Sequence, residues 1–95
     1  MIETMPGLTY GRLARTLKEH GFDERVTEAG RTFLHESGAR LPLPPLSDQE
    51  PLRAYHYVAA RALLDDYGIL SRETFDLLLA RKTLARNPVP APVAR

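Results

Sequence analysis

The spacing of apolar residues follows a helical period in the first part of the chain. Leu13 and Leu17 recur on one face of a possible helix, and Thr9 precedes them as a residue that can cap its first turn. Gly21 supplies a left-handed stop, and the apolar residue after it can fold back on the last turn. The pattern predicts a helix over about residues 10–20.

An alternating period of two replaces the helical one in the next twenty residues. Three strand candidates, at residues 25–27, 31–36 and 39–43, are separated by glycine-containing turns. Proline has no N–H to donate, so Pro42 should lie in an edge strand or at an unpaired position of the third strand. The pattern predicts a three-stranded antiparallel meander.

The helical period returns after a proline-rich loop. Apolar residues from Leu52 onward predict a helix over about residues 51–67, with Pro51 in its first turn and a second glycine stop at Gly68. Ser71 can then cap a third helix whose apolar residues extend to Leu84.

These elements predict an α+β fold of one domain at residues 1–86. Two helices lie on one face of the antiparallel sheet in the order α-β-β-β-α, an extra helix follows, and the other sheet face stays open. Residues 87–95 alternate with proline and are expected to form an extended, flexible tail.

Composition narrows the function classes. The net charge of +1, from 13 basic and 12 acidic residues, gives no overall attraction to nucleic acid, so any such binding needs a local basic patch. The absence of cysteine excludes disulfides, thiolate nucleophiles and cysteine zinc sites. Neither a signal peptide nor a run of about 20 apolar residues occurs, so we expect a cytoplasmic protein without a membrane contact.

Several short motifs follow one another along residues 8–79. They are Thr9-x-Gly11-x-Leu13-x-x-x-Leu17-x-x-x-x-Gly21-Phe22, a strand with Phe33 and His35, Gly38-x-x-Leu41-x-Leu43-Pro44, and a helix ending at Gly68-Ile69 before Glu73 and Phe75. Their order and spacing resemble the HicA (YcfA-like) family of mRNA interferase toxins.

The resemblance implies a double-stranded-RNA-binding-like fold, an activity that binds or cleaves RNA, and a HicB-like antitoxin partner. It also implies a catalytic histidine in a Gly-Ser-His run in the second strand. In this chain the residues after Gly30 are Arg31, Thr32 and Phe33, and His35 matches a later histidine of the family strand. The sequence therefore resembles a divergent member of the family that lacks the usual catalytic run.

His35 is the candidate catalytic residue. As a general base it would remove the proton of an RNA 2′-hydroxyl, and an ordinary histidine pKa of about 6.5 suits that role near neutral pH. Strand alternation places Arg31 and Phe33 on the same face, so a phosphate-binding cation is close by. The alternative interpretation is a solvated strand residue beside a hairpin turn.

Two groups of cations are candidates for RNA binding. Arg25, Arg31 and Arg40 come from successive strands and could form one patch, or they could pair with interleaved glutamates across the sheet. Residues Arg12, Arg15 and Lys18 lie on the first helix and resemble the helix contact of double-stranded-RNA-binding folds, although a solvated helix face has the same composition.

We expect structural roles for the other two histidines. His56 would cover one flank of the core or bond into the proline-rich loop, and His20 would complement the helix dipole. The three histidines lack metal-ligand spacing, so no metal or other cofactor is expected.

Two functions follow. The first is a HicA-like RNA-binding protein of a toxin-antitoxin system, an mRNA interferase whose catalysis is impaired or absent. The second is a non-catalytic interaction module that binds a protein partner, or itself as a homodimer, through the open sheet face.

Overall fold

The computed structural model describes residues 3–84, so the tail expected at 87–95 lies outside the described residues. Helices and strands follow one another in this order: β1 (Thr4–Thr9), α1 (Tyr10–Glu19), β2 (Asp23–Thr27), β3 (Gly30–Leu34), β4 (Arg40–Leu43), β5 (Pro51–Arg53), α2 (Ala54–Asp66) and α3 (Arg72–Leu84).

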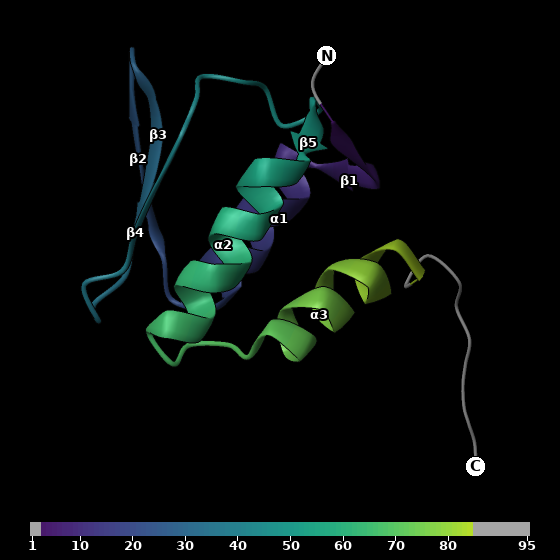
Figure 1. The fold of residues 1–95 in the computed structure, drawn as a ribbon. Helices are drawn as coiled ribbons and strands as arrows, with labels where there is room; N and C mark the ends of the chain where they lie inside the picture. The colour runs from purple at the N-terminus through teal and green to yellow at the C-terminus, as the bar shows by residue number, and fades with distance from the viewer. Residues whose placement is uncertain (1–2, 85–95) are drawn as a thin grey trace.

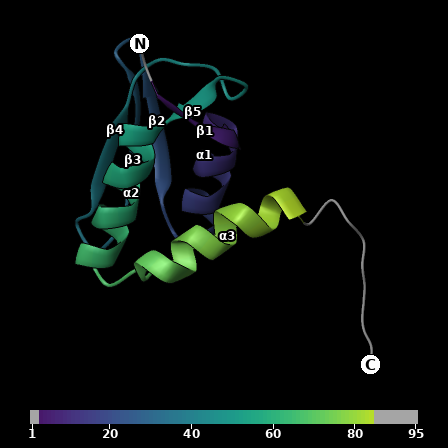
Figure 2. The same cartoon turned by 45° about the vertical axis from the view of Figure 1, so that its right-hand side comes forward.

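The fold is α+β, with α1 and α2 against one face of a three-stranded antiparallel sheet (Figure 1). The strand order is β2-β3-β4, which confirms the meander, and β1 pairs with β5 in a separate two-stranded sheet. The C-terminal helix α3 lies on the far side of α1 and α2 from the sheet, as the rotated view also shows (Figure 2). The other face of the three-stranded sheet is left open.

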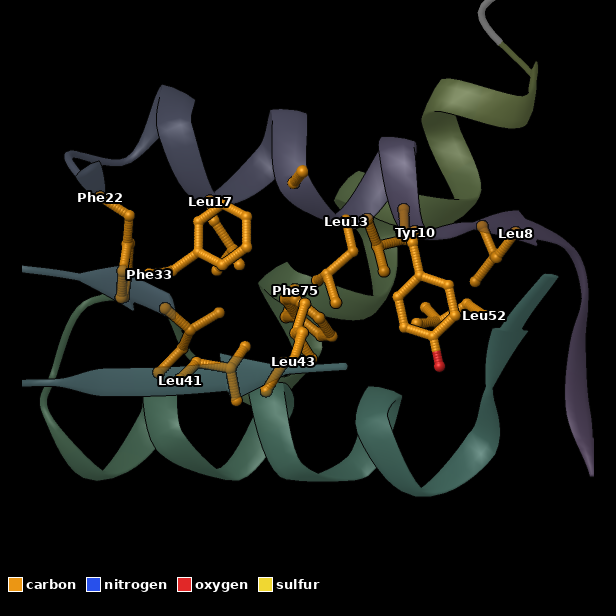
Figure 3. Packing of buried hydrophobic residues seen from close by; sticks show 14 of the residues in the cluster. Leu8, Tyr10, Leu13, Leu17, Phe22, Phe33, Leu41, Leu43, Leu52 and Phe75 are labelled. Atoms are coloured by element: carbon orange, nitrogen blue, oxygen red, sulfur yellow. The ribbon is translucent and has the colours of Figure 1, made fainter. Parts of the chain in front are cut away.

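The core fills the space between these layers (Figure 3). Each described element except β2 contributes buried or half-buried apolar side chains, because the apolar positions predicted from the sequence converge there. The fully covered side chains of the sheet and helices include Phe33, Leu13, Leu17, Leu52, Leu64 and Phe75.

The first turn of α1 is capped from two directions. Thr9 Oγ1 accepts a hydrogen bond from the backbone N–H of Arg12 at 3.2 Å, as predicted. The N–H groups of Tyr10 and Gly11 donate to the carbonyl oxygens of Glu50 and Asp48, at 3.1 and 2.9 Å. The loop before β5 therefore satisfies helix donors that would otherwise have no partner.

Gly11 allows this loop to approach the helix. A Cβ atom at that position would lie 2.8 Å from Cβ of Asp48 and 3.0 Å from the Asp48 carbonyl oxygen. Any larger residue would push the loop away from the first turn of α1.

The predicted glycine stop of α1 is confirmed. Gly21 adopts φ of 91°, its N–H donates to the carbonyl of Lys18, and the N–H of Phe22 donates to the carbonyl of Leu17 at 3.1 Å. Helix α2 ends in the same way, since the N–H of Ile69 donates to the carbonyl of Leu64 at 2.9 Å.

The predicted start of one helix is wrong, and one strand was not predicted. Helix α2 begins at Ala54 rather than near residue 51, because Pro51–Arg53 forms the strand β5. Strand β1 was not predicted, since Pro6 and Gly7 interrupt any alternation in Thr4–Thr9.

Helix α3 is capped and clamped onto its neighbour. Ser71 Oγ accepts from the N–H of Thr74 at 3.1 Å, as predicted. The hydroxyl of Tyr57 donates to Asp76 Oδ1 at 2.5 Å, and Nε of Arg61 binds the same carboxylate at 3.0 Å. These contacts tie α3 to α2 beside the buried ring of Phe75.

Candidate functional site

The strand register separates the candidate arginines of the sheet onto two faces. Arg25 lies opposite Thr32, and Arg40 lies opposite Leu34. These positions share the open face, whereas Arg31 lies opposite Leu43, which is buried under the helices. The structure therefore does not bring Arg25, Arg31 and Arg40 into one patch.

Arg31 is occupied by contacts within the chain. Its guanidinium lies 3.0 Å from Glu24 Oε2 and 2.8 Å from Asp48 Oδ1, and it donates to the carbonyl of Leu46 at 3.2 Å. The side chain is 12% exposed. The guanidinium thus holds the loop before β5 against the sheet. Of the two interpretations of Arg31, the one that it pairs with a glutamate across the sheet is the one observed.

The exposed side of α1 carries the other cations. Arg12, Arg15 and Lys18 follow one another at three-residue spacing along one side of the helix, and Arg12 is half-buried while the other two are exposed. Lys18 Nζ lies 2.7 Å from Glu24 Oε1, which places this side of α1 next to β2. The hydrogen bond from Lys18, together with that from Arg31, lowers the pKa of Glu24 below its usual value. We call Arg12, Arg15 and Lys18 the α1 basic face.

The predicted second strand extended over residues 31–36, but β3 ends at Leu34, so His35 lies in the turn that leads to β4 and not in the strand with Arg31. Its ring packs against Phe22, with ring centroids 4.9 Å apart. The backbone N–H of Ser37 donates to Nδ1 of His35 at 3.0 Å, and the Ser37 hydroxyl lies 2.9 Å from the same nitrogen. These contacts fold the turn around one nitrogen of the ring.

The Ser37 contact selects one neutral form of the imidazole. A backbone N–H can only donate, so Nδ1 of His35 accepts, and Nε2 carries the hydrogen. A general base needs a free lone pair at the nitrogen that faces the substrate. In this neutral form, Nε2 of His35 is a hydrogen-bond donor.

A surface pocket of about 400 Å³ lies beside this ring, where α1 ends and the turn after β3 begins. Its lining is Gly21, Asp23, Arg25, Leu34, His35 and Glu36. Gly21 leaves the ring uncovered, since a Cβ atom there would lie 3.2 Å from Nε2 of His35. The pocket combines two donors, Arg25 and His35, with two carboxylates, so it presents no uniform positive charge to a phosphate.

Sequence reasoning missed a second polar cluster, around His56. The hydroxyl of Tyr10 lies 2.6 Å from Nδ1 of His56 and accepts from the N–H of Arg53 at 3.4 Å, and the ring of Tyr55 stacks beside His56 at 4.2 Å. Burial, with the nearby charge of Arg53, lowers the pKa of His56, and burial raises the pKa of Tyr10. The position of Tyr10 on the apolar side of α1 was the one signal for this contact.

His20 is held by its own helix. Its Nδ1 lies 2.9 Å from the carbonyl oxygen of Thr16, so this nitrogen donates. Among the described side chains, no group of three or more histidines and carboxylates could hold a metal ion. No helix in the described part of the chain has the length and apolar character needed to cross a bilayer.

Comparison of the chain with protein-family models, curated proteins and solved structures finds no match.

Proposed function

We propose that the chain is a HicA-like RNA-binding protein of the cytoplasm, with a double-stranded-RNA-binding-like fold and without the catalytic function of an mRNA interferase. The observation that carries the proposal is the succession α1, β2, β3, β4 and α2, with both helices on one face of the meander and cations along α1. This is the arrangement that the resemblance to the HicA family implies.

The α1 basic face is the proposed contact for the RNA backbone. Arginine and lysine at three-residue spacing can reach successive phosphates along one side of a helix, and phosphate contacts supply most sequence-independent affinity. Arg15 is exposed, which leaves its charge available to a ligand. Lys18 is exposed too but is shared with Glu24, whose Oε1 lies 2.7 Å from its Nζ. Arg31, by contrast, is already neutralised by Glu24 and Asp48.

The hydrogen position on His35 supports binding in place of cleavage. With Nδ1 held by Ser37, the ring can donate from Nε2 to a phosphate oxygen or base edge at the pocket. Removal of a 2′-hydroxyl proton would require the opposite arrangement. The partner proposed for the HicA-like function is a HicB-like antitoxin.

The test is RNA binding at increasing salt concentrations. We expect the affinity of the wild-type protein to fall steeply with salt, because each neutralised phosphate releases counterions. Replacement Arg15→Ala should weaken binding and reduce the salt slope by about 1. Replacement Arg40→Ala is the matched control, since Arg40 is an exposed arginine on the open sheet face, away from α1. Equal effects of the two replacements, or affinity that does not change with salt, would contradict the proposal.

A second candidate function is a protein-interaction module. The open sheet face carries polar and charged side chains among its exposed positions, including Asp23, Arg25 and Arg40, so it is not an apolar docking face. The observation that favours this function lies at the edge of the sheet, where Val26 of β2 is 71% exposed.

A further inference from the structure

The edge strands of the two sheets differ in whether they contain proline. In the described part of the chain the edges are β1, β5, β2 and β4. Pro6 lies in β1, Pro51 in β5 and Pro42 in β4, whereas β2 has none. Proline lacks the N–H that a further strand needs, and natural sheets use it to block edge pairing. Strand β2 is therefore the edge that can accept another strand.

The side chains of Asp23, Arg25 and Val26 in β2 are exposed at this edge. Val26 is the most exposed of the large apolar residues in the described part of the chain, at 71%. Asp23 and Arg25 are exposed on the open face, and neither forms an ion pair within the described residues. An added strand would cover the apolar side chain and could neutralise both charges.

The sequence of β2 complements itself in one register. Two identical antiparallel strands are related by a twofold axis perpendicular to the sheet, so each residue faces one on the same side of the sheet. A register centred on Arg25 places two arginines opposite each other, and one centred on Val26 places Glu24 opposite Glu28.

The register centred on Glu24 gives favourable pairs. Asp23 of each copy then lies opposite Arg25 of the other. Val26 lies opposite Phe22, the residue before β2, which is buried in its own copy and whose N–H is already donated to Leu17. The two Glu24 side chains meet at the axis, but each already has Lys18 and Arg31 as ion-pair partners. Their charges are therefore compensated within each copy.

We propose that two copies of this chain associate by antiparallel pairing of β2 with β2, centred on Glu24, so that their three-stranded sheets join into one continuous sheet. Backbone hydrogen bonds along the edge supply the attraction, and the Asp23–Arg25 pairs fix the register. The contact is small, so the dimer should form in the weak, concentration-dependent range.

The proposed dimer places the α1 basic face of each copy beside the seam, because Lys18 pairs with Glu24 of β2. Rotation about an axis perpendicular to the sheet keeps both α1 helices on the same side of the joined sheet. Self-association is measured without RNA, so its failure is distinguished from a failure of RNA binding.

The experiment is sedimentation equilibrium of the full chain at micromolar to millimolar concentrations, without RNA. We expect a monomer–dimer equilibrium in which Asp23→Arg alone, or Arg25→Asp alone, raises the dissociation constant by about tenfold or more, because two symmetry-related pairs change from attraction to repulsion. The double replacement Asp23→Arg with Arg25→Asp reverses both charges and should restore the dissociation constant to within about threefold of wild type.

Replacement Arg40→Asp is the control, because it changes the same charge on the same sheet face but on the proline-containing edge strand β4. Circular dichroism of each variant confirms that the exposed replacements leave the fold intact. A wild-type protein that stays monomeric throughout, or a dimer that the single replacements leave unchanged or the double replacement fails to restore, would overturn the proposal.

Discussion

The hydroxyl of Tyr10 at the start of α1 lies 2.6 Å from Nδ1 of His56 in the first turn of α2. Tyr10 is fully buried, and its oxygen also accepts from the N–H of Arg53 in β5. The hydroxyl can accept that N–H and still donate its one hydrogen to Nδ1 of neutral His56, the form that the lowered pKa of His56 favours. When His56 is neutral, this hydrogen bond connects α1 with α2 beside the two-stranded sheet of β1 and β5.

Acidification should destabilise the protein through His56. Its folded pKa lies below the unfolded value of about 6.5 because burial and Arg53 disfavour the cation. The unfolded state therefore binds more protons between the two pKa values, so the stability is fully present above about pH 6.5 and decreases as the pH falls toward the folded pKa. Urea unfolding from about pH 7.5 to about pH 5 measures this loss.

The variant His56→Gln separates this effect from other groups. Glutamine can accept from Tyr10 through its side-chain oxygen but does not titrate. We expect the variant to lose less stability than wild type over the same pH range, while the contribution of Glu24, whose pKa is also lowered, stays the same in both. Equal losses in both proteins would show that another group causes the acid sensitivity.

The contact of Tyr57 with Asp76 should govern stability at alkaline pH. Burial, with the hydrogen bond to Asp76, raises the pKa of Tyr57 to about 12. Since the folded pKa exceeds the unfolded value of 10.0, this stabilisation is fully present below pH 10.0 and is lost as the pH rises toward about 12. Replacement Tyr57→Phe should lower the free energy of unfolding at neutral pH by about 1 kcal/mol and remove this alkaline transition.

Ultraviolet absorption at increasing pH measures the summed ionisation of the four tyrosines, and the difference between wild type and Tyr57→Phe gives that of Tyr57. The control is Tyr55→Phe, which removes an exposed tyrosine that contacts Arg53 rather than a carboxylate. The late ionisation should shrink in Tyr57→Phe without disappearing, because burial also raises the pKa of Tyr10. A late ionisation that is as large in Tyr57→Phe as in wild type would show that the raised pKa does not belong to Tyr57.

Replacement Gly11→Ala should destabilise the protein although alanine favours helices. The added Cβ would lie 2.8 Å from Cβ of Asp48, so the loop must move and weaken the Gly11 N–H bond to the Asp48 carbonyl and the Arg31–Asp48 ion pair. We expect a net loss of about 1–3 kcal/mol, because overpacking outweighs the helix propensity of about 1 kcal/mol. Thermal unfolding checks this, with the exposed Arg15→Ala in the same helix as the control. A higher melting temperature for Gly11→Ala would show that the loop yields freely.

Local signals account for the parts of the fold that sequence reasoning predicted. The stop at Gly21 and the cap at Ser71 depend on residues within one helical turn, and both are confirmed. The β1–β5 pair was missed because Thr4 lies opposite Arg53, a contact between distant segments that leaves no periodic signal when each strand contains proline. For the same reason Pro51, which suits a first helical turn, was assigned to the wrong element.

In the candidate site, too, local patterns were predicted correctly and contacts between distant segments were missed. Alternation along β3 correctly grouped Arg31 and Phe33 on one face, but it could not show that this face lies under the helices. The Glu24 partner of Arg31 follows from strand pairing, whereas Asp48 comes from a loop that folds back over α1. Whether Arg31 is available to bind a phosphate thus depends in part on its contact with Asp48, which the sequence pattern does not show.

The form of His35 gives the most direct test of whether this chain can cut RNA. The donor from Ser37 to Nδ1 requires hydrogen on Nε2, so long-range nitrogen–proton NMR correlations at neutral pH should assign the hydrogen of the neutral ring to Nε2. We expect end-labelled RNA to stay intact with the wild-type protein, because a nitrogen that carries its hydrogen cannot take the 2′-hydroxyl proton.

The matched comparison for His35 is His35→Ala in the same cleavage assay. Ser37→Ala removes the hydroxyl at 2.9 Å but keeps the backbone N–H that sets the form of the ring, so its NMR assignment should remain that of wild type. Cleavage by the wild-type protein that disappears in His35→Ala would show that His35 acts as a base despite its contact with Ser37. The protein would then be an active ribonuclease. Intact RNA in both lanes, with salt-sensitive binding, would instead leave α1 and its cations as the working surface.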